Sequence, residues 1–259
     1  MTTGASGHRH GMQPTTARDL SGTVAVVTGA SSGIGEATAR ALSVLGATVA
    51  LVARRADRLQ QLAHELAEAG GQADPVEVDV TDADAVRAAL DGVAERHGAI
   101  DVLVNNAGVA RSGPAAEADL ADWQLMVEVN LGGVLNATHA ALPHLLAAAS
   151  GTRGVADLVT VSSASGRRVP KPESNVYAAT KHAVGAFSEG LRQELGPQGV
   201  RVGLVEPGFV VTELTAGRDF GEREALQAED VADAIGYMVT RPAHMGVNEL
   251  LVRAVDQVS

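Results

Sequence analysis

The sequence predicts an α/β fold, a single-domain doubly wound parallel sheet flanked by helices on both faces. Short runs of β-branched residues alternate with longer segments of helical periodicity along the 259 residues. Such alternation is typical of parallel strands joined by right-handed crossovers. Hydrophobic residues make up 46% of the chain but aromatic residues only 2%. The core must therefore be built from Ala, Val, Leu and Ile, which suits buried parallel strands.

Each strand is predicted from a short apolar run, and each helix from its periodicity and end signals such as Gly46 and Gly70 at C-termini. The predicted strands are Thr23–Thr28, Thr48–Ala53, Pro75–Val80, Asp101–Asn105, Ala156–Ser163, Arg201–Glu206 and Glu249–Val252. The predicted helices are Glu36–Leu45, Ala56–Ala69, Asp82–His97, Asp119–Ala149, Asn175–Leu195 and Glu229–Thr240, with a loop and one helical turn over Thr212–Ala228. Residues 1–20 lack periodicity and are expected to be a disordered extension, and residues 21–259 show no repeat or linker and are expected to form one domain.

A glycine-rich turn, Gly29-Ala30-Ser31-Ser32-Gly33-Ile34-Gly35, follows the first strand and opens the first helix. Glycines let the backbone approach a pyrophosphate closely, and the helix N-terminus supplies unpaired N–H groups and partial positive charge. The spacing differs from Gly-x-Gly-x-x-Gly, so an ordinary strand-to-helix loop is the alternative. The context favours a dinucleotide site.

The second strand ends at Ala53, and Arg54 and Arg55 follow it. An NAD site commonly carries an acidic residue at this place, which bonds the ribose 2′-OH. Arginine instead forms charge-assisted bonds to a phosphate. This pattern predicts NADP(H), with a basic helix start and no ligand as the alternative. Asp79, at the end of the third strand, is expected near the adenine.

Tyr177 and Lys181 lie four residues apart in a predicted helix, so they share one face. An ammonium beside a phenol lowers the pKa of the phenol and makes it a usable proton donor or acceptor. The chain has two lysines, Lys171 and Lys181, and arginine elsewhere, so a retained lysine suggests a need for a compact charge. Taken alone, this pair could also be a chance arrangement on a solvated face.

Composition excludes several classes of function. The net charge of −11 argues against nucleic acid or an anionic membrane as the main partner. The absence of cysteine removes disulfides, thiolate metal sites and a cysteine nucleophile, and the eight histidines show no metal-binding spacing. We find no signal-peptide core and no apolar run of membrane-spanning length, so we expect a soluble, cytoplasmic protein without a metal.

The glycine turn, Asp79 and the segment 105–108 all lie where predicted strands end, as do Ser163 and Pro207-Gly208. In a parallel sheet these carboxyl ends meet at one edge, where ligands bind. The loop 166–172, which carries Arg167, Arg168 and Lys171, should border the same pocket. Pro170 and Pro172 limit its freedom, and we hypothesise a substrate with a carboxylate or other anion. A solvated basic loop, or one that contacts a neighbouring subunit, is the alternative.

The ordered set of motifs resembles the short-chain dehydrogenase/reductase family, whose members have a Rossmann-like fold. The resemblance covers about Leu20–Ser259 and is carried by Thr28–Gly35, Asp79, Asn105–Gly108, Asn130, Ser163, Tyr177/Lys181 and Pro207-Gly208. The stretches Leu51–Leu59 and Asn248–Gln257 look like the NADP-linked subgroup that includes clavulanate-aldehyde reductase and 3-hydroxy-acid dehydrogenases. The glycine-rich ending of the fatty-acid ketoacyl reductases is absent.

This resemblance implies an NADPH-dependent oxidoreductase that transfers hydride between the nicotinamide and a small carbonyl or alcohol substrate. It implies Tyr177 as general acid, Ser163 as a hydrogen bond to the substrate oxygen, Lys181 on the nicotinamide ribose and Asn130 on a relaying water. Ser163 precedes Tyr177 by fourteen residues, one more than the commonest family spacing, so Ser162 or Ser165 could take its place. The implied cofactor-binding residues are Gly29, Ser31, Ser32, Gly33, Ile34, Gly35, Arg54, Arg55, Asp79, Val80, Asn106, Ala107, Gly108, Tyr177, Lys181, Pro207, Gly208, Val210 and Thr212.

The family also implies a homotetramer in which the helices over Asp119–Ala149 and Asn175–Leu195 pair between subunits. Two alternatives share the fold: a non-catalytic NADP-sensing protein, and a member that performs epimerisation or dehydration with bound cofactor. A non-catalytic member would be expected to lack the Tyr, Lys or Ser, and all three are present.

Overall fold

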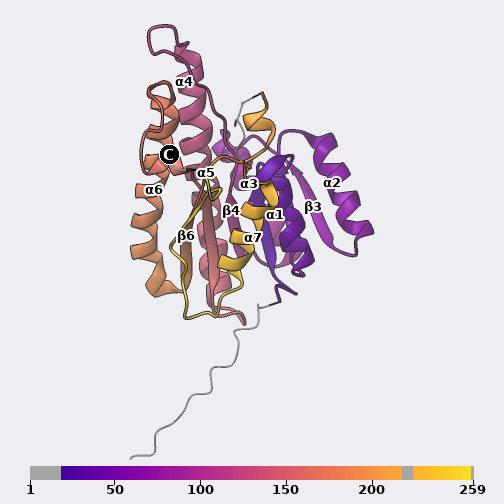
Figure 1. Ribbon diagram of the computed structural model, residues 1–259. Coiled ribbons are helices and arrows are strands. Elements are labelled where there is room, and N and C mark those ends of the chain that lie inside the picture. Colours follow the sequence, from indigo (N-terminus) through magenta and orange to yellow (C-terminus); the bar gives the residue numbers. More distant parts are fainter. Residues whose placement is uncertain (1–18, 218–223, 258–259) are drawn as a thin grey trace, which may run out of the picture.

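The computed structural model describes residues 19–217 and 224–257. Seven parallel strands form one sheet in the order β3-β2-β1-β4-β5-β6-β7 (Figure 1). The strands are β1 (Val24–Thr28), β2 (Thr48–Ala53), β3 (Gln72–Glu77), β4 (Val102–Asn105), β5 (Ala156–Val161), β6 (Val200–Pro207) and β7 (Glu249–Val252). The order reverses at β1 and β4, and this confirms the predicted doubly wound parallel sheet in a single domain.

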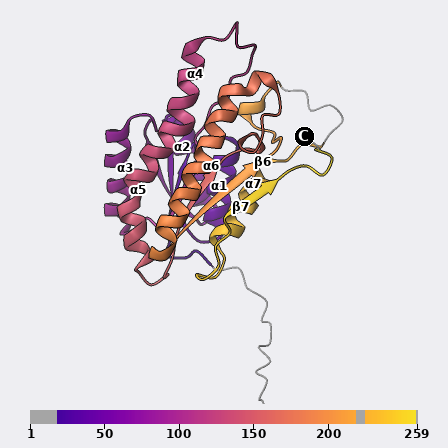
Figure 2. The ribbon, with the colours of Figure 1, turned by 90° about the vertical axis from the view of Figure 1, so that its left-hand side faces the viewer.

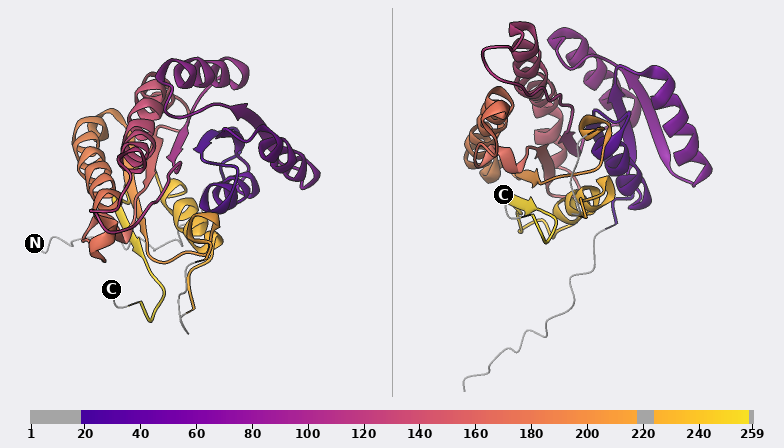
Figure 3. Two further views of the ribbon diagram at one scale, coloured as in Figure 1. Left: turned by 90° about the horizontal axis from the view of Figure 1, so that it is seen from above. Right: turned by 45° about the horizontal axis from the view of Figure 1, so that its top comes forward.

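Helices cover both faces of the sheet (Figure 3). Alternate residues of β1 divide between two apolar cores because successive side chains point to opposite faces. Ala25 and Val27 pack with α1, α2 and α7, whereas Val24 and Val26 pack with α3, α5 and α6 (Figure 2). The helices are α1 (Gly33–Val44), α2 (Ala56–Glu68), α3 (Ala83–His97), α4 (Leu120–Val127), α5 (Gly133–Ala149), α6 (Asn175–Leu195) and α7 (Ala228–Val239).

The third strand lies three residues earlier than its apolar run predicts. β3 begins at Gln72 and ends at Glu77, because it is an edge strand whose residues are partly exposed and need not be apolar. Pro75 pairs in register with Leu51 of β2, and an edge strand tolerates the missing N–H of proline. Asp79 therefore lies in the loop after the strand.

The predicted helix Asp119–Ala149 is three segments. A π-helical turn, Glu128–Gly132, joins α4 to α5. Such turns insert an extra residue and frequently lie at functional sites. This turn carries Asn130, whose side chain bonds to the backbone of Val109.

Smaller differences concern element ends. α1 begins at Gly33 rather than Glu36, and β5 ends before Ser162 and Ser163. Leu20 is buried, and its N–H donates to the Leu45 carbonyl, so order begins before the expected boundary. The rest of the predicted extension, residues 1–18, lies outside the described residues. After β6, the expected helical turn is a 3₁₀ turn at Glu213–Thr215. In the described part of the chain no helix is long and apolar enough to span a membrane.

Candidate active site

A cavity of about 430 Å³ opens at the carboxyl ends of the strands. Every residue predicted to bind the cofactor lines it except Gly35. Tyr177, Lys181 and Ser163 also line it, whereas Asn130 lies behind the wall. Sequence motifs from the whole length of the chain thus meet in one cavity, as parallel-sheet topology requires.

The glycine turn packs directly against the segment after β4. Gly29 has φ of +69°, and a Cβ there would lie 2.9 Å from the Cα of Ala107. A Cβ on Gly35 would lie 2.2 Å from the Gly29 carbonyl oxygen. Gly35 therefore shapes the turn from beneath, and this explains why it does not line the cavity. The Asn106 amide donates to the Thr28 carbonyl at 3.0 Å and fixes the two segments together.

The two arginines after β2 differ in their surroundings. Arg54 is two-thirds exposed and lies 3.5 Å from the Asp79 carboxylate. Burial opposes ionisation of Asp79, but hydrogen bonds from Thr81 and the charge of Arg54 outweigh it and hold its pKa below the usual value. Arg55 donates to Ser31 at 3.0 Å and to Ser32 at 2.7 Å. Arg55 is therefore tied to the glycine turn, and Arg54 is the more accessible cation.

Lys181 is a buried cation beside Tyr177. Its side chain lies within the cavity wall, and Nζ donates to the Val161 carbonyl at 2.9 Å and lies 5.8 Å from the centroid of the Tyr177 ring. Burial lowers the pKa of Lys181 to about 8, because the charged form loses hydration. The ammonium is still the main form at neutral pH, so a positive charge lies next to the phenol.

Asn130 is fully buried and connects three segments. Its side-chain oxygen accepts from the Val109 N–H at 2.8 Å, and its amide donates to the Val109 carbonyl at 2.9 Å and to the Thr180 hydroxyl at 3.2 Å. A Cβ placed on Gly108 would lie 3.4 Å from the Asn130 oxygen and 3.8 Å from Lys181 Nζ. Asn130 thus holds the loop after β4 against the helix that carries Lys181.

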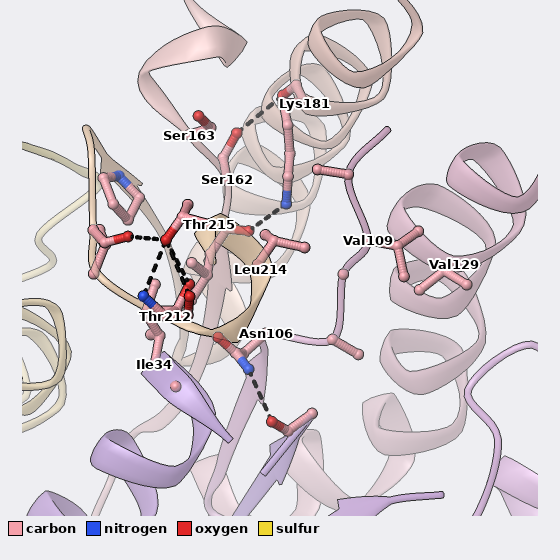
Figure 4. A pocket seen from close by; sticks show the side chains of 18 of the residues that line it. Ile34, Asn106, Val109, Val129, Ser162, Ser163, Lys181, Thr212, Leu214 and Thr215 are labelled. Atoms are coloured by element: carbon pink, nitrogen blue, oxygen red, sulfur yellow. Dashed lines mark hydrogen bonds between the residues drawn. The ribbon is translucent and has the colours of Figure 1, made fainter. Parts of the chain in front are cut away.

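The structure distinguishes the candidate serines. Ser162 is buried, and its hydroxyl donates to the Lys181 carbonyl at 3.1 Å (Figure 4). Ser163 lines the cavity and accepts from the Ser165 N–H at 3.1 Å, an interaction that leaves the hydroxyl proton available for donation. Ser162 also lines the cavity, but its hydroxyl proton is used by the α6 backbone. Ser165 also lines the cavity.

The basic loop does not present its arginines alike. Arg167 pairs with the buried Glu206 and with Glu249, both at 2.5 Å. Burial raises the pKa of Glu206 despite this partner. Arg168 and Pro170 line the cavity, whereas Arg167 and Lys171 are not among its lining residues. The loop borders the pocket as expected, but Arg167 is committed to a structural ion pair.

Sequence motifs did not identify several lining residues. Phe209, Leu214, Thr215 and Gln257 come from the segment after β6 and from the C-terminus. The side-chain oxygen of Gln257 accepts from the Phe209 N–H at 3.0 Å. These positions carry no motif spacing, and their approach depends on the chain folding back after β7, so no local signal would have found them.

Comparisons with known proteins agree with this geometry. A family model of short chain dehydrogenases matches residues 23–222. An uncharacterised oxidoreductase of Staphylococcus epidermidis is 41% identical over 232 residues, which are 90% of this chain and 97% of the relative.

Two solved structures cover nearly all of the chain. An alcohol dehydrogenase from the archaeon Thermococcus sibiricus, complexed with 5-hydroxy-NADP, has a TM-score of 0.83 at 33% identity and covers 92% of this chain and 98% of its own. Serine dehydrogenase from Escherichia coli has a TM-score of 0.79 at 34% identity and covers 92% of this chain and 100% of its own. The chain belongs to the short-chain dehydrogenase/reductase family and is an oxidoreductase of that family.

Proposed function

We propose that this protein is an NADP(H)-dependent oxidoreductase that interconverts a small carbonyl compound and its alcohol, with Tyr177 as general acid and base. The observation that carries the proposal is the meeting of Tyr177, Lys181 and Ser163 with the glycine turn around one cavity. A proton donor thus shares a cavity with a site suited to a pyrophosphate.

NADPH, when bound, supplies the hydride for carbonyl reduction. The Tyr177 hydroxyl donates a proton to the substrate oxygen, and such positioned acids contribute about 10²–10⁴-fold to the rate. The Ser163 hydroxyl donates a hydrogen bond to the same oxygen and stabilises its developing charge. The buried ammonium of Lys181 stabilises the phenolate form of Tyr177 that remains after the proton has been transferred. In the reverse direction, the phenolate accepts the alcohol proton.

Two further residues support proton transfer and cofactor binding. Asn130 holds the loop after β4 against α6 and, by the family resemblance, would hold a water that relays a proton to Lys181. Lys181 would also donate to the hydroxyls of the nicotinamide ribose. The glycine turn and the N-terminus of α1 suit the pyrophosphate, and Asp79, which lines the cavity, would border the adenine.

The choice of NADP(H) rests on Ala53 and the arginines that follow it. No carboxylate stands at position 53 to accept a bond from a ribose hydroxyl, and Arg54 lies exposed at the cavity rim. Arginine pairs well with a phosphate through charge-assisted bonds. The Thermococcus sibiricus relative was solved with 5-hydroxy-NADP, which supports the same choice.

A panel of aldehydes, ketones and keto acids assayed with NADPH and NADH tests this function. We expect carbonyl-dependent oxidation of NADPH and at least a tenfold lower kcat/KM with NADH. Tyr177→Phe should remove turnover and leave NADPH binding nearly intact, because the ring stays and only the hydroxyl is lost. Retention of more than about a tenth of kcat would contradict the acid role. A lack of reduction across the panel, with NADPH still bound, would favour the sensing, epimerising or dehydrating alternatives.

We infer further that the substrate carries an anionic group, with Arg168 as its partner. Arg168 comes from the loop between Ser163 and Tyr177 and lines the cavity, and a guanidinium pairs well with a carboxylate. The Escherichia coli relative is a serine dehydrogenase, and serine carries a carboxylate, which is consistent with this substrate class.

Matched carbonyl substrates with and without a carboxylate test this inference. Arg168→Ala should lower kcat/KM for the anionic member about tenfold or more and leave the neutral member within about twofold, because one charge-assisted hydrogen bond contributes about 1.5–3 kcal/mol. Lys171→Ala is the matched control, since that cation of the same loop does not line the cavity. An equal effect of Arg168→Ala on both substrates would refute recognition of the anion.

A further inference from the structure

Arg55 already has an anionic partner within the protein. Its Nη1 donates to the Glu213 carboxylate at 2.8 Å, while its Nε and Nη2 donate to Ser31 and Ser32. Glu213 belongs to the 3₁₀ turn after β6, 158 residues from Arg55 in the chain. A carboxylate from the turn after β6 thus reaches a guanidinium from the segment after β2.

Glu213 is held by more than one cation. The second carboxylate oxygen lies 3.7 Å from Nη1 of Arg58, one turn further along α2. The hydrogen bond from Arg55 holds the pKa of Glu213 below its usual value. Glu213 therefore carries a full negative charge at neutral pH.

This negative charge stands beside the glycine turn of the candidate cofactor site. Ser31, Ser32 and Arg55 line the cavity, as do Thr212 and Leu214 on either side of Glu213. The donors that Glu213 occupies are of the kind that a ribose 2′-phosphate requires: a guanidinium fixed by two serine hydroxyls. A carboxylate and a phosphate present the same charged oxygens to such donors.

We propose that Glu213 is an internal competitor for the 2′-phosphate of NADP(H) and sets the strength of cofactor discrimination. This inference rests on the proposed use of NADP(H). A bound 2′-phosphate either takes the Arg55 contact from Glu213 or stands beside a like charge, and both outcomes lower its affinity. NAD(H) has a hydroxyl in that place and meets neither cost. Arg58 gives the displaced carboxylate a second partner.

Fragment binding to the full-length protein tests the inference. Isothermal titration compares 2′,5′-ADP, which carries the 2′-phosphate, with 5′-AMP, which lacks it. Glu213→Gln keeps the size of the side chain and removes its charge. We expect it to tighten 2′,5′-ADP about tenfold and to leave 5′-AMP within about twofold. Glu189→Gln is the matched control, because Glu189 is an exposed glutamate on α6 that pairs with Arg192 and is not among the residues that line the cavity.

The outcomes separate this inference from the cofactor proposal. Unchanged or weaker binding of 2′,5′-ADP by Glu213→Gln would overturn the competition. Weaker binding of both nucleotides would show that Glu213 instead clasps the cofactor, which also overturns it. If the parent protein binds the two nucleotides equally but Glu213→Gln tightens 2′,5′-ADP alone, the competition stands and the NADP(H) preference of the parent fails. Thermal unfolding of both variants within about 2 °C of the parent confirms that the change in affinity is local.

Discussion

At the scale of single residues, Lys181 combines burial with charge. It is a buried cation in the cavity wall that donates a hydrogen bond to the Val161 carbonyl. Such a group is costly to ionise, and its pKa falls to about 8 for that reason. A charge kept despite this cost indicates a function, since a neutral side chain would be more stable in the same place.

Lys181 should make stability depend on pH in a defined window. Its folded pKa of about 8 lies below the ordinary lysine pKa of 10.5, so between these values the unfolded chain binds more protons and stability rises with pH. The free energy of unfolding of the parent, relative to Lys181→Met, should increase by about 3 kcal/mol from pH 7.5 to 10.5. Urea unfolding of both proteins across this range measures the difference, and other titrating groups cancel. A constant difference would show that burial does not shift this lysine.

Residue types were predictable from the sequence, but side-chain directions were not. The motifs identified Tyr177 and Lys181, because a helix of regular pitch fixes their relation. Arg167 and Arg168 look equivalent as adjacent cations, yet one pairs with Glu206 and the other lines the cavity. Glu206 lies 39 residues after Arg167 in the chain. No local sequence pattern shows which of the two arginines forms the ion pair with it.

At the scale of elements, buried strands were the easiest to predict and irregular backbone the hardest. β1, β4 and β5 are mostly apolar and buried on both sides, so their composition is diagnostic. β3 is exposed at the sheet edge and its start was missed. The π-helical turn at Glu128–Gly132 was also missed, because one extra residue hardly alters the apolar periodicity. Asn130 was the visible sign of it, as a polar residue in a helix interior.

The glycine turn permits a sharp test of its packing. Gly35→Ala should lower the free energy of unfolding by about 1–3 kcal/mol and remove NADP(H) binding, because the added Cβ meets the Gly29 carbonyl oxygen at 2.2 Å. Denaturant unfolding and nucleotide titration measure the two effects.

Gly190→Ala is the matched control for that variant. A Cβ on Gly190 in α6 meets nothing within 4 Å, and alanine is the better helix former by about 1 kcal/mol. It should therefore leave binding unchanged and raise stability slightly. If both variants behave alike, close packing of the turn is not what requires glycine at position 35.

At the scale of the whole molecule, topology turns weak motifs into one site. The carboxyl ends of parallel strands meet at one edge, so the order of the motifs along the sequence is enough to predict the position of the cavity. What the sequence did not indicate is how the segments around the cavity contact one another. The contact between Arg55 and Glu213 joins segments far apart in the chain, and neither belongs to a repeating pattern.

The outer surface of α4 and α5 predicts assembly into a homotetramer. Leu120, Val127 and Leu135 are 62%, 46% and 40% exposed, and α4 and α5, which carry them, lie in the layer of helices in front of the sheet in Figure 2. Exposed large apolar side chains on one layer of helices indicate an interface, here between copies of the chain. Light scattering at micromolar concentration should give a mass near four times 26.4 kDa.

Val127→Asp with Leu135→Asp should reduce that mass, because a buried charge opposes association. Val44→Asp, on α1 at an 85% exposed position, should keep it. A monomeric parent protein would refute the tetramer, and a full-size assembly in the double variant would place the interface elsewhere.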